Sequence, residues 1–462
     1  MALHEIRKGL ELPISGAPGR TVEIAPAPRR VAFLAADFPG LKPQLRVQVG
    51  DAVRRGQVLL EDKRLPGVRH TAAASGKVVA IHRGERRALQ SVVIELDAAE
   101  RGGNPGPDAF QSFAAFTGKV PAALSRDEVQ ALLLESGLWT AFRMRPFGRV
   151  PKPGSVPRSI FVTAIETDPL GADVDAALAG DEAHFRTGLS CIRLLSVGKT
   201  YLCRKAGSKT GDPCPEGITI EEFSGPHPAG LPGLHIHILD PVCRGKTVWH
   251  LSAADVAAIG NLFATGQIDP ARVVALGGPQ AKNPRLLRTR LGASLDDILA
   301  GELKEGENRV VSGSVLSGRA ASGDVTGFLG RRHLQVSVLC EDRERKFMGW
   351  AAPGARTFSV LPLFFSSLFP GRRFDMTTSA NGAPRAIVPI GLYERVFPFD
   401  IIPTYLFRSL AAKDDETAEA LGCLELDEED VALCSFVCPG ESDFGAWLRQ
   451  SLDRIEGEEE GE

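Results

Sequence analysis

SIFVTAIETDPLGAD, residues 159–173, joins a short apolar strand to an acidic turn that contains proline. Helical and strand-like segments alternate around it: predicted helices at about 125–137, 182–196 and 252–263, and predicted strands at 200–203 and 273–276. This alternation predicts a parallel sheet covered by helices. Ligands of such sheets bind at the carboxyl ends of the strands. We therefore expect Glu166 to Asp173 and Gly277 to Pro279 to face any site.

Capping signals mark the ends of two of the predicted helices. Ser125 and Glu128 have the capping-box spacing S-x-x-E, and Gly137 follows the last residue of that helix. Ser294 and Asp297 have the same relation at the start of a small helix that follows the strand near 288. With the Gly/Ser-rich strand at 308–318, this order suits a small β-grasp module.

Phosphate-binding motifs are missing from the predicted α/β region. Gly198, Lys199 and Thr200 look like the end of a P-loop, but Arg193 stands where the first glycine is required. No G-x-G-x-x-G follows a predicted strand. Direct binding of NADH or another nucleotide is therefore not expected.

Residues 45–81 alternate in the manner of short strands, with turn glycines at 50, 56, 67 and 76. Their pattern resembles the barrel-sandwich fold of biotinyl and lipoyl domains. In that family a lysine at a hairpin tip carries the cofactor, and here Lys63 follows Asp62 at the corresponding place. Residues 64–67 lengthen the turn, however, and we interpret Lys63 as an ordinary surface lysine.

Three histidines gather in FSGPHPAGLPGLHIHILD, residues 223–240. His235 and His237 are two residues apart on an expected strand, so both rings would lie on one face. With a third ligand such as His227 they could hold zinc. No cysteine or carboxylate lies at a clean ligand spacing nearby, so hydrogen-bonded histidines are the favoured interpretation.

A cysteine pattern near the carboxyl end matches half of an iron–sulfur motif. Cys434 and Cys438, followed by proline, repeat the end of C-x2-C-x2-C-x3-C-P, but Glu428 and Val431 occupy the other two positions. Cys423 would be a distant third thiolate, and an ordinary cluster needs four. We expect a helical turn that keeps the shape of the motif without the metal, and free thiols throughout the chain.

Composition excludes several classes of protein. Among 462 residues, 54 Lys and Arg nearly balance 57 Asp and Glu, which argues against nucleic-acid binding. The hydrophobic fraction of 43% excludes a disordered chain. Residues 1–10 lack a signal-peptide core, and the longest apolar stretch, 358–370, is too short to span a bilayer. We expect a cytoplasmic protein, with a solvated and disordered acidic tail at 456–462.

The whole chain resembles the A subunits of the bacterial sodium-translocating NADH:quinone oxidoreductases. The segments that carry this resemblance span its length: IRKGLELPI (6–14), LLEDKRLPGVR (59–69), ESGLWTAFR (135–143), FSGPHPAG (223–230), HIHILDPV (235–242), VVALGGPQ (273–280), RTRLGASLD (288–296), SGSVLSGR (312–319), VPIGLYERV (388–396) and ALGCLELDEEDVALCSFVCPG (420–440).

The resemblance implies an α/β and α+β multidomain fold. Its parts are a barrel-sandwich hybrid at 1–105, a Rossmann-like α/β domain at 106–260, an SLBB-like β-grasp at 261–315, an irregular β region at 316–385, and a helical domain at 386–462 with a relic cysteine motif and the acidic tail.

The resemblance also implies a place in a complex. That complex passes electrons from NADH to ubiquinone while exporting Na+, and uses NAD, FAD, FMN and ubiquinone. This chain would be a peripheral subunit on the cytoplasmic face of the bacterial inner membrane, reaching the membrane through five partner subunits and possessing no catalytic, cofactor-binding or metal residue of its own. Whether ubiquinone touches it stays open.

More distantly, the domain order resembles the flavin-binding subunit of complex I and the C subunit of the Rnf complex. Those relatives hold flavin with a glycine-rich loop and an acidic E-x-E-P strand end. Here Glu166-Thr167-Asp168-Pro169 keeps the strand end, but the loop has become residues 137–145, with Trp139 and Phe142 in place of glycines. Backbone cannot approach a phosphate closely through such side chains. The comparison implies a former redox subunit that has lost its cofactors.

Three hypotheses remain at this point: a cofactor-free subunit of the sodium pump, a flavin- or Fe–S-carrying subunit of the Rnf or complex I type, and an acyl or lipoyl carrier centred on Lys63. The first would need exposed apolar surface for docking. Residues 358–369 or 397–407 could supply it, and both stretches could equally be core.

Overall fold

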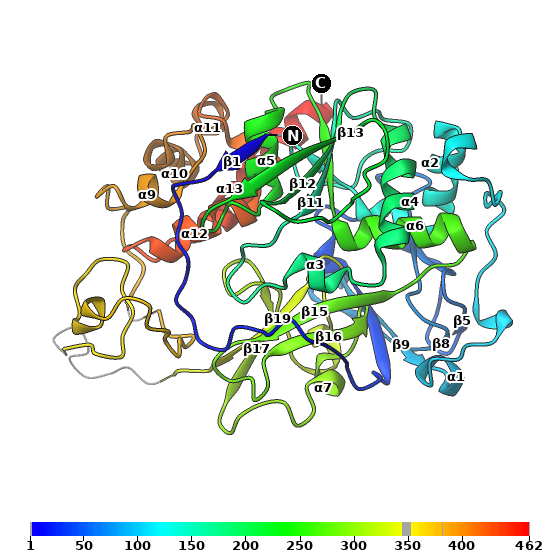
Figure 1. Ribbon diagram of the computed structural model, residues 1–462, viewed down its shortest axis with the longest axis horizontal. Helices are drawn as coiled ribbons and strands as arrows, with labels where there is room; N and C mark the ends of the chain where they lie inside the picture. Colours follow the sequence, from blue (N-terminus) through cyan, green and yellow to red (C-terminus); the bar gives the residue numbers. More distant parts are fainter. Residues whose placement is uncertain (1, 344–352, 381, 462) are drawn as a thin grey trace.

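The computed structural model describes residues 2–343, 353–380 and 382–461. Their strands form two sheets of six strands, one of four and one of three (Figure 1). Within the described part of the chain, no helix is both long and apolar enough to cross a membrane.

The first six-stranded sheet is the α/β sheet that the sequence predicts. Five of its strands are parallel, and the edge strand β10 is antiparallel to β14. The order is β1 (Leu3–Glu5), β13 (Ile218–Ser224), β12 (Thr200–Lys205), β11 (Ile160–Ala164), β14 (Val248–Ser252), β10 (Arg143–Arg145).

Helices cover both faces of this sheet. Successive side chains of β11 point to opposite faces and are buried against the helices on each side. Ile160 and Val162 face a core shared with α2 (Arg126–Ser136), α4 (Glu182–Ile192) and α6 (Ala253–Thr265), whereas Phe161 faces α5 (Pro232–Leu239). The predicted capping box of Ser125 and Glu128 is confirmed. Gly137 ends α2 in a left-handed conformation, as predicted.

The second six-stranded sheet is mixed. Its order is β18 (Arg319–Ala320), β17 (Asn308–Ser312), β19 (Gln335–Cys340), β15 (Ala271–Gly277), β16 (Arg285–Arg290), β2 (Val22–Ile24). The prediction that residues 273–276 continue the parallel α/β sheet is wrong. Their strand β15 pairs antiparallel with β16 and parallel with β19, because the chain turns straight back after it. Ser294 caps the short helix α7 (Leu295–Ile298), as predicted.

The two small sheets build the barrel-sandwich hybrid. One has the order β3 (Arg30–Leu34), β9 (Leu89–Leu96), β8 (Gly76–Arg83), β5 (Ala52–Val53), and the other β4 (Pro43–Leu45), β6 (Val58–Asp62), β7 (Arg69–Thr71). Val53, Leu60, Val78, Val92 and Ile94 fill the space between them.

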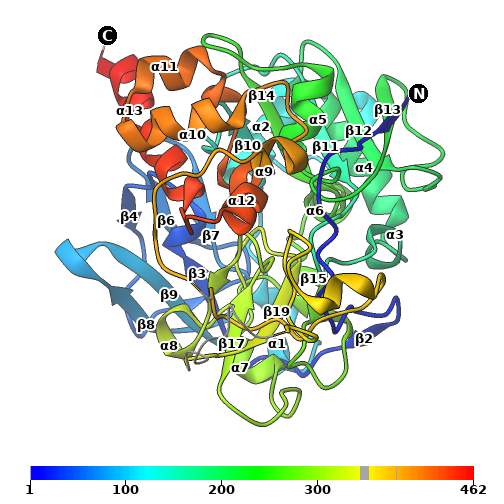
Figure 2. The same ribbon diagram turned by 90° about the vertical axis from the view of Figure 1, so that its left-hand side faces the viewer.

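The amino-terminal segment ties these parts together. β1 pairs in parallel with β13 of the α/β sheet, and β2 pairs with β16 of the mixed sheet. In both views its blue trace crosses the molecule before the barrel-sandwich hybrid begins (Figures 1 and 2).

Helices form the carboxyl-terminal part: α9 (Leu392–Val396), α10 (Pro403–Ala412), α11 (Asp415–Ala420), α12 (Glu428–Val437) and α13 (Phe444–Gly461). The prediction of a disordered tail at 456–462 is wrong up to residue 461, since α13 continues that far and residue 462 lies outside the described residues. Arg149 Nη2 lies 2.6 Å from Glu456 Oε2, an ion pair that fixes this turn against the body of the protein.

The remaining elements are short. They are the α-helical turns α1 (Ala98–Arg101), α3 (Val174–Ala177) and α8 (Gly323–Thr326), and the 3-10 turns η1 (Ala35–Asp37), η2 (Glu85–Arg87), η3 (Pro107–Ala109), η4 (Pro121–Ala123), η5 (Leu138–Ala141), η6 (Arg193–Leu195), η8 (Phe365–Leu368) and η9 (Cys423–Glu425). In the expected irregular region at 316–385, residues 344–352 and 381 lie outside the described residues.

Candidate functional site

A cavity of about 490 Å³ opens where all four parts of the fold meet. Its walls come from the loop after β11, the end of β14, the η1 turn of the barrel-sandwich hybrid, the segment before β19 and the start of α12. Representative lining residues are Asp37, Arg143, Glu166, His250, Arg332 and Glu429. This size matches the pockets that hold small organic ligands.

The α/β sheet places this cavity as the sequence predicts for one strand end. Glu166, Asp168 and Ala172 follow β11 and line the cavity, so the expectation for residues 166–173 is confirmed. The expectation for residues 277–279 is wrong. β15 belongs to the mixed sheet, and the Gly278 amide donates to the Gly16 carbonyl at 2.9 Å instead of facing the cavity.

Buried arginines and carboxylates join the α/β sheet to the start of α12. Arg145 is fully buried and donates from Nη1 to Asp430 Oδ2 at 2.7 Å. Arg143 Nη2 lies 2.9 Å from Asp427 Oδ2. Burial opposes ionisation of Asp427, but Arg143 and Arg145 hold its pKa well below the ordinary value. These ion pairs join β10 to the start of α12, two elements almost three hundred residues apart in the sequence.

Two carboxyl groups of the cavity hold protons more tightly than ordinary glutamates. Burial, and then the neighbouring Asp168 carboxylate, raise the pKa of Glu166 to about 8. Burial raises the pKa of Glu429 to about 7 against the opposing effect of Arg143 and Arg145. Near neutral pH the cavity wall therefore carries titrating carboxyl groups.

Glu166 predicts a pH dependence of stability. The pKa of Glu166 is higher in the folded state than the ordinary 4.5. Its contribution to the free energy of unfolding is therefore complete below about pH 4.5 and is lost as the pH rises through about 8. Glu166→Gln should remove this loss, so between about pH 5 and 9 its free energy of unfolding should fall less than that of the parent, by roughly 1–3 kcal/mol. Urea unfolding over this range measures it, and parallel curves would contradict the assignment.

Several buried polar atoms of residues that line the cavity have no protein partner within the described chain. They are Nε and Nη2 of Arg332, Nε2 of His250 and Oγ1 of Thr163. Burial, and then the charges of Arg143 and Arg331, lower the pKa of Arg332 to about 9. Burial keeps the pKa of His250 well below its ordinary value, so its ring is neutral. Such donors suit a ligand that brings hydrogen-bond acceptors.

An aromatic cluster fills the core beside the loop at residues 137–145. Trp139 and Phe142 are fully buried against Trp249 of β14, with ring centroids 5.2 and 5.5 Å from that indole. Trp139 Nε1 donates to the Pro151 carbonyl at 2.8 Å, which satisfies the buried indole. These three side chains thus belong to the core of the α/β part.

The three candidate histidines have separate partners. The prediction of a strand at 235–237 is wrong, because Pro232 starts the helix α5 there, so His235 and His237 do not share one face of a strand. His235 bonds the Ala229 carbonyl at 2.9 Å, His237 bonds Glu425 at 2.7 Å, and His227 lies 3.8 Å from Asp168. Across residues 2–343, 353–380 and 382–461, no three His, Cys, Asp or Glu are grouped to hold a metal ion.

The cysteines of the half motif are buried in the helical part. Cys434 lies on α12 and Cys438 caps it, with Cys438 Sγ 3.1 Å from Tyr393 Oη. Burial raises the pKa of the Cys434 thiol well above its ordinary value and that of Cys423 to about 12. All three side chains lie within an apolar core.

Lys63 is exposed in the loop between β6 and β7, and its amide donates to the Lys42 carbonyl at 2.9 Å. That location is the one the sequence predicts, and the interpretation of an ordinary surface lysine stays a prediction. The two candidate docking stretches differ. In 397–407 the three phenylalanines Phe397, Phe399 and Phe407 are core and Ile402 and Tyr405 are exposed, whereas residues 363–369 expose four large apolar side chains.

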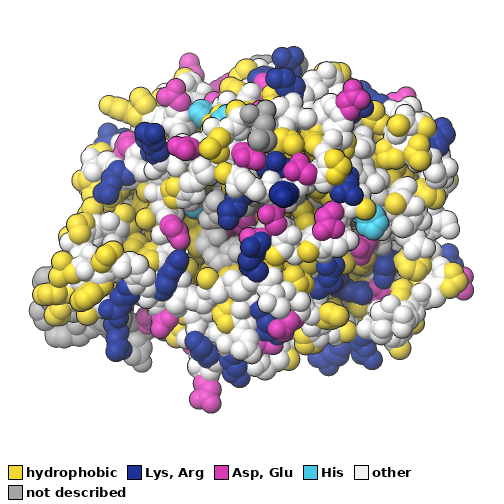
Figure 3. All heavy atoms as spheres, viewed as in Figure 1, with side chains coloured by type: hydrophobic (Ala, Val, Ile, Leu, Met, Phe, Trp, Pro, Cys, Tyr) yellow, Lys and Arg dark blue, Asp and Glu magenta, His cyan; other side chains and the backbone are white. Residues whose placement is uncertain are grey.

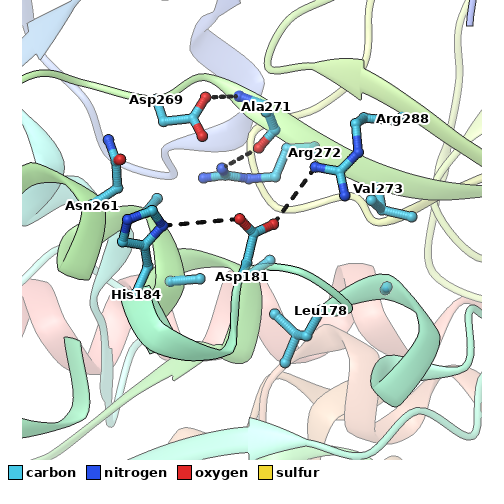
Figure 4. A pocket seen from close by; sticks show the side chains of 13 residues that line it. Leu178, Asp181, His184, Asn261, Asp269, Ala271, Arg272, Val273 and Arg288 are labelled. Atoms are coloured by element: carbon cyan, nitrogen blue, oxygen red, sulfur yellow. Dashed lines mark hydrogen bonds and ion pairs between the residues drawn. The ribbon is translucent and has the colours of Figure 1, made fainter. Parts of the chain in front are cut away.

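A second, much smaller pocket lies between α4, α6 and the mixed sheet (Figure 4). Asp181 there lies 3.6 Å from Arg288 and 3.9 Å from His184. Its volume of about 30 Å³ suits ordered water and no organic ligand. The large cavity is therefore the candidate site.

Sequence reasoning missed the donors of this cavity. His250 precedes Ser252 at the end of an apolar strand, and Arg332 belongs to the charged run RRH just before β19. A polar residue near the carboxyl end of a buried parallel strand was the available signal for His250. Nothing local predicts that Arg332 faces the same space, because β19 lies in another sheet.

Comparisons with known proteins match the chain throughout. Family models match at residues 4–97 (NqrA N-terminal barrel-sandwich hybrid domain), 124–268 (NqrA second alpha/beta domain) and 273–323 (NQRA C-terminal domain). The chain is 52% identical to the A subunit of the Na(+)-translocating NADH-quinone reductase of Klebsiella pneumoniae (strain 342), over 98% of this chain and 99% of the relative. It is 51% identical to the proteins of the same name from Cellvibrio japonicus (strain Ueda107) and Pseudomonas aeruginosa (strain PAO1), over the same shares.

Similarity to solved structures is weak. Two structures of an NAD+-reducing [NiFe]-hydrogenase, in the H2-reduced and air-oxidized states, show TM-scores of 0.36 and 0.37 with 16% and 14% identity. The alignments cover 55% and 80% of this chain, and 59% and 74% of those chains. At this level the likeness carries no argument.

Proposed function

The chain belongs to the family of A subunits of the Na+-translocating NADH-quinone reductases, and from this premise we propose that it serves such a complex without binding a redox cofactor of its own. In this proposal the complex transfers electrons from NADH to ubiquinone and exports Na+ by means of its NAD, FAD and FMN sites. This subunit lies at the cytoplasmic face of the inner membrane and assembles with five others.

The observation that carries the proposal is the aromatic cluster of Trp139, Phe142 and Trp249. A flavin phosphate needs close backbone amides, and these buried rings exclude that approach. The acidic strand end remains, but burial keeps a proton on Glu166 near neutral pH. This arrangement favours a scaffold subunit over the alternative, a flavin- or Fe–S-carrying subunit of an Rnf- or complex I-like assembly.

Purification from membranes tests the proposed place in the complex. A tagged full-length chain, expressed in its own host, should co-purify with five other subunits and with NADH:ubiquinone reductase activity that depends on Na+. The flavins should be assigned to the other subunits by denaturing electrophoresis and mass spectrometry. A chain that purifies alone, or flavin bound to this chain, would overturn the proposal.

We further propose that ubiquinone touches this chain in the large cavity. Its wall combines apolar side chains such as Ile165, Leu231 and Leu334 with the unpartnered Arg332 guanidinium nitrogens and the unpartnered Nε2 of His250. A quinone ring is flat and apolar and accepts hydrogen bonds at its two carbonyl oxygens. The cavity offers both kinds of contact, which is what small-molecule sites require.

Arg332→Gln tests this contact. A hydrogen bond from a charged donor is worth about 1.5–3 kcal/mol, so the variant complex should show a KM for a short-chain ubiquinone that is about ten- to a hundredfold higher. The matched control is Arg54→Gln, an exposed arginine of the barrel-sandwich hybrid, which should leave KM unchanged. Equal KM values for parent, variant and control would exclude the contact.

A further inference from the structure

Exposed apolar side chains concentrate in one segment of the molecule. We define the η8 loop as residues 354–374, with the turn η8 (Phe365–Leu368) at its centre. Its exposed fractions are 71% for Leu363, 60% for Phe365, 67% for Leu368 and 58% for Phe369. The large exposed aromatic side chains of the described residues are Phe365 and Phe369 in this loop, Tyr405 on α10 and Phe436 on α12. Apolar exposure on this scale marks a binding surface.

The η8 loop is anchored at both ends of its exposed part. The Phe358 ring lies 5.7 Å from Phe374 and 6.3 Å from Phe436 of α12. Val360 and Leu361 pack against the core of the helical part. The Phe374 amide donates to the Pro13 carbonyl at 2.7 Å. The loop thus buries one set of apolar residues and presents a second set outward.

Charge in the η8 loop has one sign. Residues 354–374 contain Arg356, Arg372 and Arg373 and no Asp or Glu. Arg356 and Arg373 are exposed, and Arg373 also lies 3.3 Å from Glu11. The Arg372 guanidinium lies 5.8 Å from the Phe374 ring centre. Figure 3 shows apolar side chains gathered at the lower left, with Lys and Arg side chains beside them.

We propose that the η8 loop binds directly to the surface of an anionic lipid bilayer. Phenylalanine and leucine side chains enter the boundary between headgroups and acyl chains, and the arginines contact lipid phosphates. In Figure 1 the loop projects from the body of the protein, so its exposed side chains can enter the headgroup region of a bilayer. Four side chains around a single turn are few for a stable protein interface, which needs about 1,000 Å² or more of buried surface.

This inference goes beyond the proposed function because it needs no other subunit. The family implies membrane contact through partner subunits, and the η8 loop adds a contact made by this chain itself. Binding of the isolated chain to pure lipid and its assembly into the complex are therefore tested separately. Either proposal can be overturned while the other holds.

Vesicle sedimentation with the full-length chain tests the apolar part of the proposal. The chain should sediment with phosphatidylcholine vesicles that contain phosphatidylglycerol. The double variant Phe365→Ser and Phe369→Ser should reduce the partition coefficient at least about tenfold, because two large apolar groups no longer leave water. The matched control is the double variant Ile24→Ser and Val197→Ser, whose side chains are 86% and 78% exposed elsewhere. It should bind as the parent does.

The charged part is tested in the same assay. Arg356→Gln and Arg372→Gln should each lower the affinity about fivefold, and high salt should weaken the parent, because lipid phosphates attract each arginine. Binding to phosphatidylcholine alone should be much weaker. Equal binding to both kinds of vesicle would overturn the proposal. Absence of vesicle binding would also overturn the proposal. If, in that case, the serine variant also fails to co-purify with the other subunits, the loop contacts protein instead of lipid.

Discussion

Arg145→Ala is expected to destabilise the protein by about 3–5 kcal/mol, the range measured when one partner of a buried ion pair is removed. The guanidinium is fully buried and contacts three carboxylates at the start of α12, those of the capping residue Asp427 and of Glu429 and Asp430. Without it, these groups must take up protons or draw in water. Chemical unfolding monitored by tryptophan fluorescence measures the change.

An exposed ion pair provides the control for this prediction. Arg46 Nη2 lies 2.7 Å from Glu61 Oε2, and the arginine side chain is 47% exposed. Arg46→Ala should cost less than about 1 kcal/mol, as surface pairs do. If the two alanine variants lose equal stability, the buried ion pairs between β10 and the start of α12 do not hold the helical part in place.

Trp139→Ala is the second large expected effect, a loss of about 3–5 kcal/mol through lost burial and a cavity beside Phe142 and Trp249. The indole also donates to the Pro151 carbonyl, which the variant leaves unpartnered. Because this side chain is part of the core, its removal should weaken the fold without creating a flavin site.

Trp447→Ala is the matched control, because this tryptophan packs only partly buried against Phe444 of α13. It should cost less than half of the Trp139→Ala effect. Flavin binding is measured on both variants by equilibrium dialysis with FMN. Tight FMN binding by Trp139→Ala alone would show that the ring merely plugs an intact flavin site.

The sequence predicted strands β11 and β12 and helices α2, α4 and α6 because their signals are local. The capping box at Ser125, the left-handed Gly137 and the apolar strand at 160–164 each depend on a few neighbouring residues. The acidic turn after that strand was placed at the cavity from the same local pattern. Helix α5 was mistaken for a strand because its alternating histidines and isoleucines mimic a two-residue period, while Pro232 marked the helix start.

Long-range pairing could not be predicted in this way. β15 has the apolar sequence of a parallel strand, yet its partners β16 and β19 come later in the chain. The cavity depends on contacts of this kind, since Arg332 and Glu429 reach it from the mixed sheet and the helical part. The structure around Glu456 likewise depends on a contact between residues far apart in the sequence. An acidic tail looks disordered until Arg149, far away in sequence, pairs with it.

One measurement addresses the central claim that this chain serves its complex without binding a redox group of its own. The full-length protein, expressed with ample riboflavin and iron, is purified under conditions that retain flavin, and its visible spectrum, flavin content and iron content are measured. The account predicts no stoichiometric flavin and no stoichiometric iron. One tightly held FMN or an iron–sulfur cluster per chain would contradict it.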